Sequence, residues 1–149
     1  MPKHIASGLK YLAAVKLKDD GKSHQAIADE LGVDRSTISH YLNGRNLSWN
    51  SIDVARTITE LSPRDFLKMA EAIFEKPEES QKIVNICQER NFEVIIEDSC
   101  IGCGLCVNAC SMKAIKLESL TAHADSIQCC GCTLCSDDCP TDSIKILEI

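Results

Sequence analysis

The sequence is poor in aromatic residues and in apolar runs, and both shortages narrow the class of protein it encodes. Phenylalanine, tyrosine and tryptophan make up only 4% of the 149 residues, too few and too scattered for a surface that stacks single-stranded nucleic acid. No apolar run reaches the roughly 18 residues that a membrane-spanning helix needs. The N-terminus lacks a charged segment followed by an apolar one, so we expect no secretion signal and a cytoplasmic location.

A recognisable catalytic arrangement is missing as well. None of the four histidines stands in the context of a paired nucleophile, and no glycine-rich loop of the phosphate-binding kind occurs. We therefore expect that the protein is not an enzyme. The histidines are His4, His24, His40 and His123.

Cysteine, in contrast, is abundant and concentrated near the C-terminus. Nine of the ten cysteines lie between Cys100 and Cys139. Eight of the nine form two runs with the spacing C-x2-C-x2-C-x3-C, the first from Cys100 to Cys110 and the second from Cys129 to Cys139. Without an export signal, this many cysteines indicates a reducing compartment and metal ligation, not a disulfide framework.

The spacing suits an iron-sulfur cluster. Three thiolates two residues apart can wrap one loop around a cubane, with the backbone N–H groups of the loop directed at the cluster sulfurs. A helix that starts near Cys106 would carry the fourth cysteine away from the loop. Zinc held by paired CxxC motifs is the weaker alternative, because such pairs are separated by a longer gap, and a redox disulfide is weaker still.

Over residues 93–149, the two runs resemble those of bacterial-type 2[4Fe-4S] ferredoxins. The resemblance implies a pseudo-twofold βαβ-βαβ fold, two [4Fe-4S] clusters and one-electron transfer at low potential. In this family the last cysteine of each run binds the partner cluster. The implied ligands are Cys100, Cys103, Cys106 and Cys139 for the first cluster, and Cys129, Cys132, Cys135 and Cys110 for the second.

Two features depart from the ferredoxin pattern. Ser111 follows Cys110 at a position where the family usually has proline, whereas Pro140 follows Cys139 as expected. A serine hydroxyl near a cluster would alter its potential or its lability. Cys130 lies outside the spacing, and it is either a small residue of the loop or a spare thiol that could replace a ligand or be oxidised.

The charge is distributed unevenly along the chain. Residues 1–62 carry eight Lys/Arg and seven Asp/Glu, whereas residues 63–149 carry eight and 15. The acidic, cysteine-bearing part suits docking to basic redox partners and repels a phosphate backbone, so any nucleic acid would have to bind the N-terminal part.

The N-terminal part has the pattern of short, capped helices. A helix over residues 5–18 is followed by one that starts after Ser23, a turn at Gly32, and another helix capped by Asp34. Residues 23–45 resemble the Cro/C1 (XRE-like) helix-turn-helix family, which implies a dimer that reads double-stranded DNA in the major groove. The implied DNA contacts are Gln25, Arg35, Ser36, Thr37, Ser39, His40, Asn43 and Arg45.

Further elements are expected on both sides of this motif and towards the C-terminus. Trp49 is expected in the core of a closing helix over residues 49–61. A helix from Pro63 carries an apolar stripe that needs a partner. The partner is the N-terminal helical domain, the ferredoxin-like domain or, as we favour in part, the same stripe on a second subunit. The stripe consists of Phe66, Met69, Ala70, Ile73 and Phe74. Short strands are expected at residues 92–98, 114–117, 126–128 and 143–147.

These patterns predict a multi-domain fold of α and α+β classes. The expected domains are a helix-turn-helix bundle (1–62), a helical linker or dimerisation segment (63–92) and a ferredoxin-like domain (93–149). The favoured hypothesis is an iron-sulfur transcription regulator that binds DNA and senses redox state, oxygen or a reactive small molecule through two clusters. The alternatives are a ferredoxin-type electron carrier whose helical domain docks a redox partner, and a protein whose clusters are purely structural.

Overall fold

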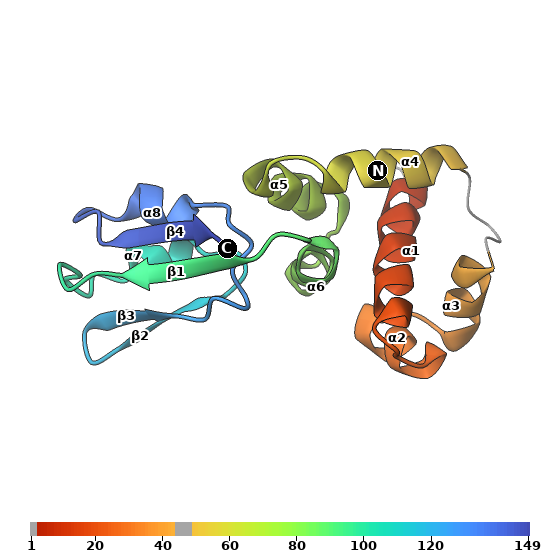
Figure 1. Cartoon of the computed structure of the whole chain (residues 1–149), viewed down its shortest axis with the longest axis horizontal. Helices are drawn as coiled ribbons and strands as arrows, with labels where there is room; N and C mark the ends of the chain where they lie inside the picture. The colour runs from red at the N-terminus through yellow and green to blue at the C-terminus, as the bar shows by residue number, and fades with distance from the viewer. Residues whose placement is uncertain (1–2, 44–48) are drawn as a thin grey trace. The chain divides into compact units, whose positions relative to one another are not determined.

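The computed structural model describes residues 3–43 and 49–149 and divides into two compact units (Figure 1). Unit 1 comprises Met1–Leu61 and Phe66–Cys87, and unit 2 comprises Ser62–Asp65 and Gln88–Ile149. Residues 66–87, expected as part of a linker, thus group with the N-terminal helices. None of the helices in the described part of the chain combines the length and the hydrophobicity that a membrane span requires.

Unit 1 is helical, and its first helix is central. Helix α1 contacts α2, α3, α4 and α6. Leu9 and Ala13 on α1 are buried, as are Ile27, Ile38 and Ile83 on three of the helices that it contacts. The helices are α1 (Lys3–Asp19), α2 (His24–Leu31), α3 (Arg35–Leu42), α4 (Trp49–Thr59), α5 (Pro63–Ile73) and α6 (Pro77–Cys87).

Local capping explains where α2 begins and ends, whereas the Asp34 side chain at the start of α3 makes no capping hydrogen bond. The Ser23 hydroxyl accepts a hydrogen bond from the Ala26 N–H at 3.2 Å at the start of α2. Gly32 ends α2 in the left-handed conformation (φ 68°), which glycine adopts without steric cost. Asp34 then occupies the N-cap position of α3 with extended backbone. The sequence therefore specifies this helical hairpin locally.

One expectation for the helices is wrong, and another is not tested. Trp49 is 77% exposed, because it is the first residue of α4 and the buried face of that helix starts only at Ser51 and Ile52. On α5, Phe66 and Ala70 are fully buried within the single chain, as is most of Phe74 just beyond the helix. Most of the stripe is therefore buried within one chain, whereas Met69 is 40% exposed, and a second subunit stays a prediction.

Close packing of α1 on α4 depends on a glycine. A Cβ atom at Gly8 would lie 2.6 Å from the Ser51 carbonyl oxygen. We expect Gly8→Ala to lower the free energy of unfolding of unit 1 by about 1–3 kcal/mol, because the backbones must move apart. Thermal unfolding followed by circular dichroism would measure the loss. The neighbouring substitution Ser7→Ala, which adds no atom at this contact, is the control, and an equal melting temperature for both variants would contradict the prediction.

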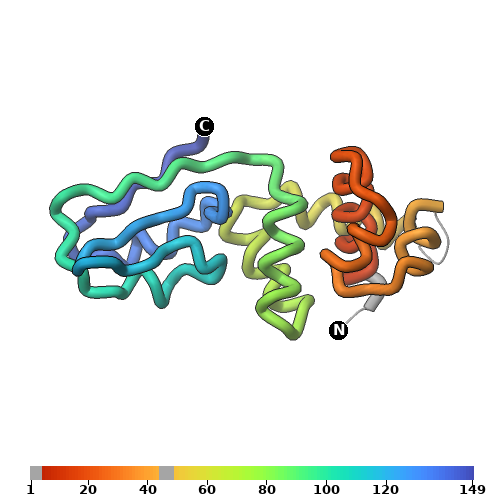
Figure 2. The backbone as a smooth tube through the Cα atoms, turned by 90° about the horizontal axis from the view of Figure 1, so that it is seen from below, coloured from red at the N-terminus to blue at the C-terminus, as the bar shows by residue number. Residues whose placement is uncertain are grey.

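Unit 2 consists of two β-α-β halves. Strand β1 (Phe92–Ile96), helix α7 (Leu105–Ala109) and strand β2 (Ile115–Glu118) form the first half, and β3 (Thr121–Ala124), α8 (Leu134–Asp138) and β4 (Ile144–Glu148) form the second. Strand β1 pairs with β4 and β2 pairs with β3, both antiparallel. In Figure 2, the green first strand and the blue last strand of the chain run side by side.

The strand expected at residues 126–128 is wrong. This segment is a turn in which the Ile127 N–H donates to the Asp125 carboxylate at 3.0 Å. The strand lies earlier, at Thr121–Ala124, because Ser119 and Leu120 take positive φ angles of 51° and 61° and close a tight hairpin after β2. Neither residue is typical of such a turn, which is why the sequence did not reveal it.

Candidate metal centre

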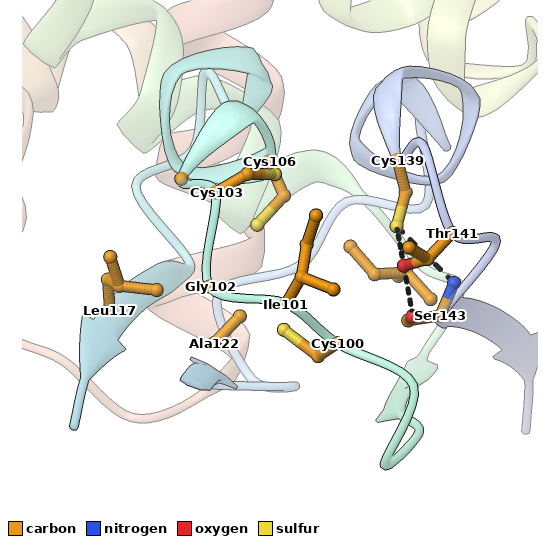
Figure 3. A pocket seen from close by; sticks show the side chains of 12 residues that line it. Cys100, Ile101, Gly102, Cys103, Cys106, Leu117, Ala122, Cys139, Thr141 and Ser143 are labelled. Atoms are coloured by element: carbon orange, nitrogen blue, oxygen red, sulfur yellow. Dashed lines mark hydrogen bonds between the residues drawn. The ribbon is translucent and has the colours of Figure 1, made fainter. Parts of the chain in front are cut away.

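Four cysteines from both runs line one cavity in unit 2. Cys100, Cys103 and Cys106 come from the loop between β1 and α7 and from the start of α7, and Cys139 comes from the end of α8. Figure 3 shows Cys139 on the opposite side of the cavity from Cys103 and Cys106. The cavity contains about 330 Å³ of open space, part of it continuous with solvent, and apolar side chains such as Leu117 complete its wall.

Glycine allows the first loop to lie close to the β2–β3 hairpin. Gly102 has a φ of 72°, and a Cβ atom there would lie 2.2 Å from the Leu120 carbonyl oxygen. Gly104, at the N-cap of α7, also has a positive φ of 78°. Only residues without a side chain fit these two positions without strain, so the loop that presents Cys103 depends on them.

The other four run cysteines also form a group that combines both halves. Burial, followed by the negative charges of Cys110, Cys132 and Cys129, raises the pKa of Cys135 to about 12. Burial, with the charges of Cys132 and Cys110, raises the pKa of Cys129 against the lowering effect of the hydrogen bond from the Gly131 N–H. The structure therefore brings Cys110, from the first run, next to the second run, just as it brings Cys139 next to the first.

Backbone N–H groups are directed at the sulfurs, as a cluster site requires. The Ala114 N–H donates to Cys110 Sγ at 3.3 Å, the Gly131 N–H to Cys129 Sγ at 3.4 Å and the Ser143 N–H to Cys139 Sγ at 3.3 Å. Such donors stabilise thiolate charge. The residues present thus fit two [4Fe-4S] clusters in donor type and in the polarity around the sulfurs.

A single metal ion and a four-iron cluster need differently spaced ligands. Among the residues that the structure describes, no three or more His, Cys, Asp or Glu side chains converge on a point where a single ion would bind. A zinc ion would need its sulfurs at about 2.3 Å from one centre, whereas a four-iron cluster spaces its ligands around a larger body.

Cys110 and Cys139, the last cysteines of the two runs and here called the crossing cysteines, have different surroundings. Burial raises the pKa of Cys139, but hydrogen bonds from the Ser143 N–H and the Thr141 hydroxyl outweigh it and leave the pKa below its usual value. The Thr141 and Ser143 hydroxyls lie 2.5 Å apart (Figure 3). The Ser143 hydroxyl also lies 2.7 Å from the Ser99 hydroxyl. At the corresponding positions after Cys110, the chain has Met112 and Ala114, which supply no hydroxyl.

Cys130, the cysteine outside the spacing, is almost completely buried at 2% exposure. A hydrogen bond from its thiol lowers the pKa of Cys132 to about 6 and raises the pKa of Cys130 itself. Gln88 also binds the Cys130 carbonyl oxygen, at 3.3 Å. Burial makes Cys130 a packing residue of the second loop, and its thiol forms a hydrogen bond with Cys132.

Sequence reasoning missed Arg64. Its Nε atom donates to the Cys132 carbonyl oxygen at 2.9 Å, and its Nη2 atom donates to the Thr133 hydroxyl at 2.7 Å. These partners are 68 and 69 residues away along the chain. No local pattern in the sequence signals such a contact.

The residues expected to contact DNA have different surroundings. Gln25 donates to Asp29 at 2.9 Å, and Ser39 is half-buried and bonded to His24 at 3.2 Å. Arg45 lies outside the described residues. Arg35, Ser36, His40 and Asn43 are exposed on or just after α3, and Thr37 is half-buried.

Comparison with known proteins identifies the cysteine-bearing region. The family model described as "4Fe-4S dicluster domain" matches residues 77–146. The chain is 32% identical over 128 residues to the "Ferredoxin-type protein FwdE" of Methanocaldococcus jannaschii, a match that covers 84% of this chain and 83% of that protein. No solved structure matches. The chain therefore carries two [4Fe-4S] clusters.

The hypothesis of a DNA-binding transcription regulator is wrong. The match to a ferredoxin-type protein extends far beyond the cysteine runs into the helical unit, and neither comparison involves DNA binding. The features that resemble a helix-turn-helix, the Ser23 cap, the small Ala28 and the Gly32 turn, determine the geometry of a helical hairpin but not its ligand. The comparisons favour the electron-carrier alternative.

Proposed function

This chain belongs to the family of ferredoxin-type iron-sulfur proteins, and from that premise we propose that it carries single electrons between redox partners and is not itself an enzyme. The observation that carries the proposal is the cavity that gathers Cys100, Cys103, Cys106 and Cys139. Bound there and at the second site, the clusters supply one-electron redox chemistry.

In this proposal, each cluster is held by three cysteines of one run and the last cysteine of the other. The first cluster has Cys100, Cys103, Cys106 and Cys139 as ligands, and the second has Cys129, Cys132, Cys135 and Cys110. Three observations support the assignment: the shared cavity, the effect of the Cys110 charge on the pKa values of Cys129 and Cys135, and the N–H donors at the sulfurs of Cys110 and Cys139.

The remaining chain provides recognition of partners. The acidic residues 63–149 would dock a basic redox protein, and the helical unit serves as a second docking module. Ten free thiols suit a reducing compartment such as the cytoplasm. Self-association stays a prediction that light scattering can test.

Electron transfer to a defined acceptor tests the proposal. The anaerobically prepared full chain is first reduced with reduced methyl viologen and then freed of the dye. It is expected to reduce a basic c-type cytochrome, with a rate that falls as salt is added because opposite charges steer the encounter. The same chain after iron removal is the control and should be inactive. If the iron-loaded chain accepts no electrons, the proposal fails.

A further inference from the structure

Arg64 links the first turn of α5 to the second cysteine loop, and all its partners there belong to unit 2. One guanidinium binds the carbonyl oxygen of Cys132, the hydroxyl of Thr133 and the carboxylate of Asp137, at 2.9, 2.7 and 2.5 Å. Three donors of a planar fork therefore hold the backbone of a cluster ligand, the next side chain and helix α8.

The residue that Arg64 holds has an unfavourable backbone conformation. Thr133 has a φ of 62°, and a β-branched residue rarely adopts such an angle unless its surroundings hold it there. The equivalent position in the first run is Gly104, with a φ of 78°, which pays no such cost. The hydrogen bond from Arg64 to the Thr133 hydroxyl compensates for the strain in the second loop alone.

The same contact places a positive charge beside one cluster site. In the first run, Gly104 offers no side chain through which a cation could be held, and Cys103 is exposed to solvent. In the second run, the Arg64 guanidinium donates to the Cys132 carbonyl oxygen at 2.9 Å and so lies directly beside the cysteine loop. Reduction adds one negative charge to a cluster, so a nearby cation favours the reduced form.

We propose that Arg64 is a positioning residue of the second cluster, which keeps the Cys132–Thr133 loop in its conformation and raises the reduction potential of that cluster only. The inference rests on the ligand assignment given under the proposed function. It goes beyond that function because a residue outside both cysteine runs sets the reduction potential of one cluster and leaves that of the other unchanged.

Potentiometric titration of the full chain, followed by electron paramagnetic resonance, tests the proposal. In Arg64→Gln, one of the two one-electron steps is expected to move to lower potential. At a fixed potential the ratio of reduced to oxidised cluster should fall about tenfold, which corresponds to about 59 mV. Arg64→Lys keeps the positive charge but not the planar guanidinium, and its reduction potentials should stay close to those of the unmodified chain. Arg90→Gln is the matched control, because it removes another arginine of unit 2 that is paired with a carboxylate, Glu148, and it should move neither step.

Iron and sulfide counts first establish that each variant holds both clusters. If Arg64→Gln holds both and neither step moves, or if both steps move equally, the inference is overturned while the electron-carrier function stands. If Arg64→Gln loses a cluster, the Arg64→Lys variant decides. Two reduction potentials equal to those of the unmodified chain support the role of the charge, and a shifted potential contradicts it. If the unmodified chain gives no one-electron step, the proposed function itself fails.

Discussion

Removing the iron is expected to unfold unit 2 and to leave the helices of unit 1 folded. The buried core of unit 2 includes Cys106 and Cys135 together with Ile115, Ala122 and Ile144, so two of the five residues are cluster ligands in our assignment. Its two sheets have two strands each, and so small a domain is only marginally stable without a metal. Loss of the clusters therefore removes the energy that holds the unit together.

Hydrogen exchange measured by mass spectrometry distinguishes the two units. After anaerobic chelation, amides of β1 and β4 should exchange within the dead time of the experiment, whereas those of α1 and α6 should remain protected, because the core around Leu9, Ile27, Ile38 and Ile83 contains no cluster. The iron-loaded chain carried through the same procedure without chelator is the control. Persistent protection of β1 and β4 without iron would contradict the prediction.

The three cysteines of each loop could be predicted from the sequence because their spacing is local. A C-x2-C-x2-C loop fixes three thiols by its own backbone path, and the structure places Cys100, Cys103 and Cys106 around one cavity. The fourth ligand depends on how the two halves pair. Only the resemblance to a ferredoxin implied that Cys139 crosses over; the structure supports this through the same cavity.

Arg64 could not be predicted, because its role depends on a contact between residues that are far apart in the chain. In the sequence it follows Ser62 and Pro63, where it reads as part of a helix start. The hydroxyl of Thr133 and the carboxylate of Asp137 become its partners only after unit 2 has folded. Long-range hydrogen bonds of this kind leave no periodic signal.

The helical hairpin shows a different limit. Its boundaries could be predicted, since Ser23 and Gly32 act on their own neighbours, but its function could not. Caps and turns determine local backbone geometry, and many proteins use the same hairpin for different partners. A pattern that specifies geometry was therefore interpreted as one that specifies a ligand.

Substituting the crossing cysteines is expected to remove the cluster of the opposite run. Cys139→Ala, although in the second run, should abolish the same one-electron step as Cys103→Ala in the first, with about half of the iron and sulfide lost from each. Cys110→Ala should abolish the other step, as Cys132→Ala does. The physical reason is that Cys139 faces the cavity of the first loop, while the charge of Cys110 acts on Cys129 and Cys135.

Cys87→Ala is the matched control, because Cys87 is a buried cysteine of unit 1 outside both runs and its loss should leave both steps in place. If Cys139→Ala instead removes the step that Cys132→Ala removes, each run holds its own cluster and the crossed assignment is wrong. If the assignment is right, the step that Arg64→Gln lowers must be the one that Cys110→Ala abolishes, since Arg64 binds the loop of Cys132. If both variants affect the same one-electron step, the effect of Arg64 is assigned to the second cluster.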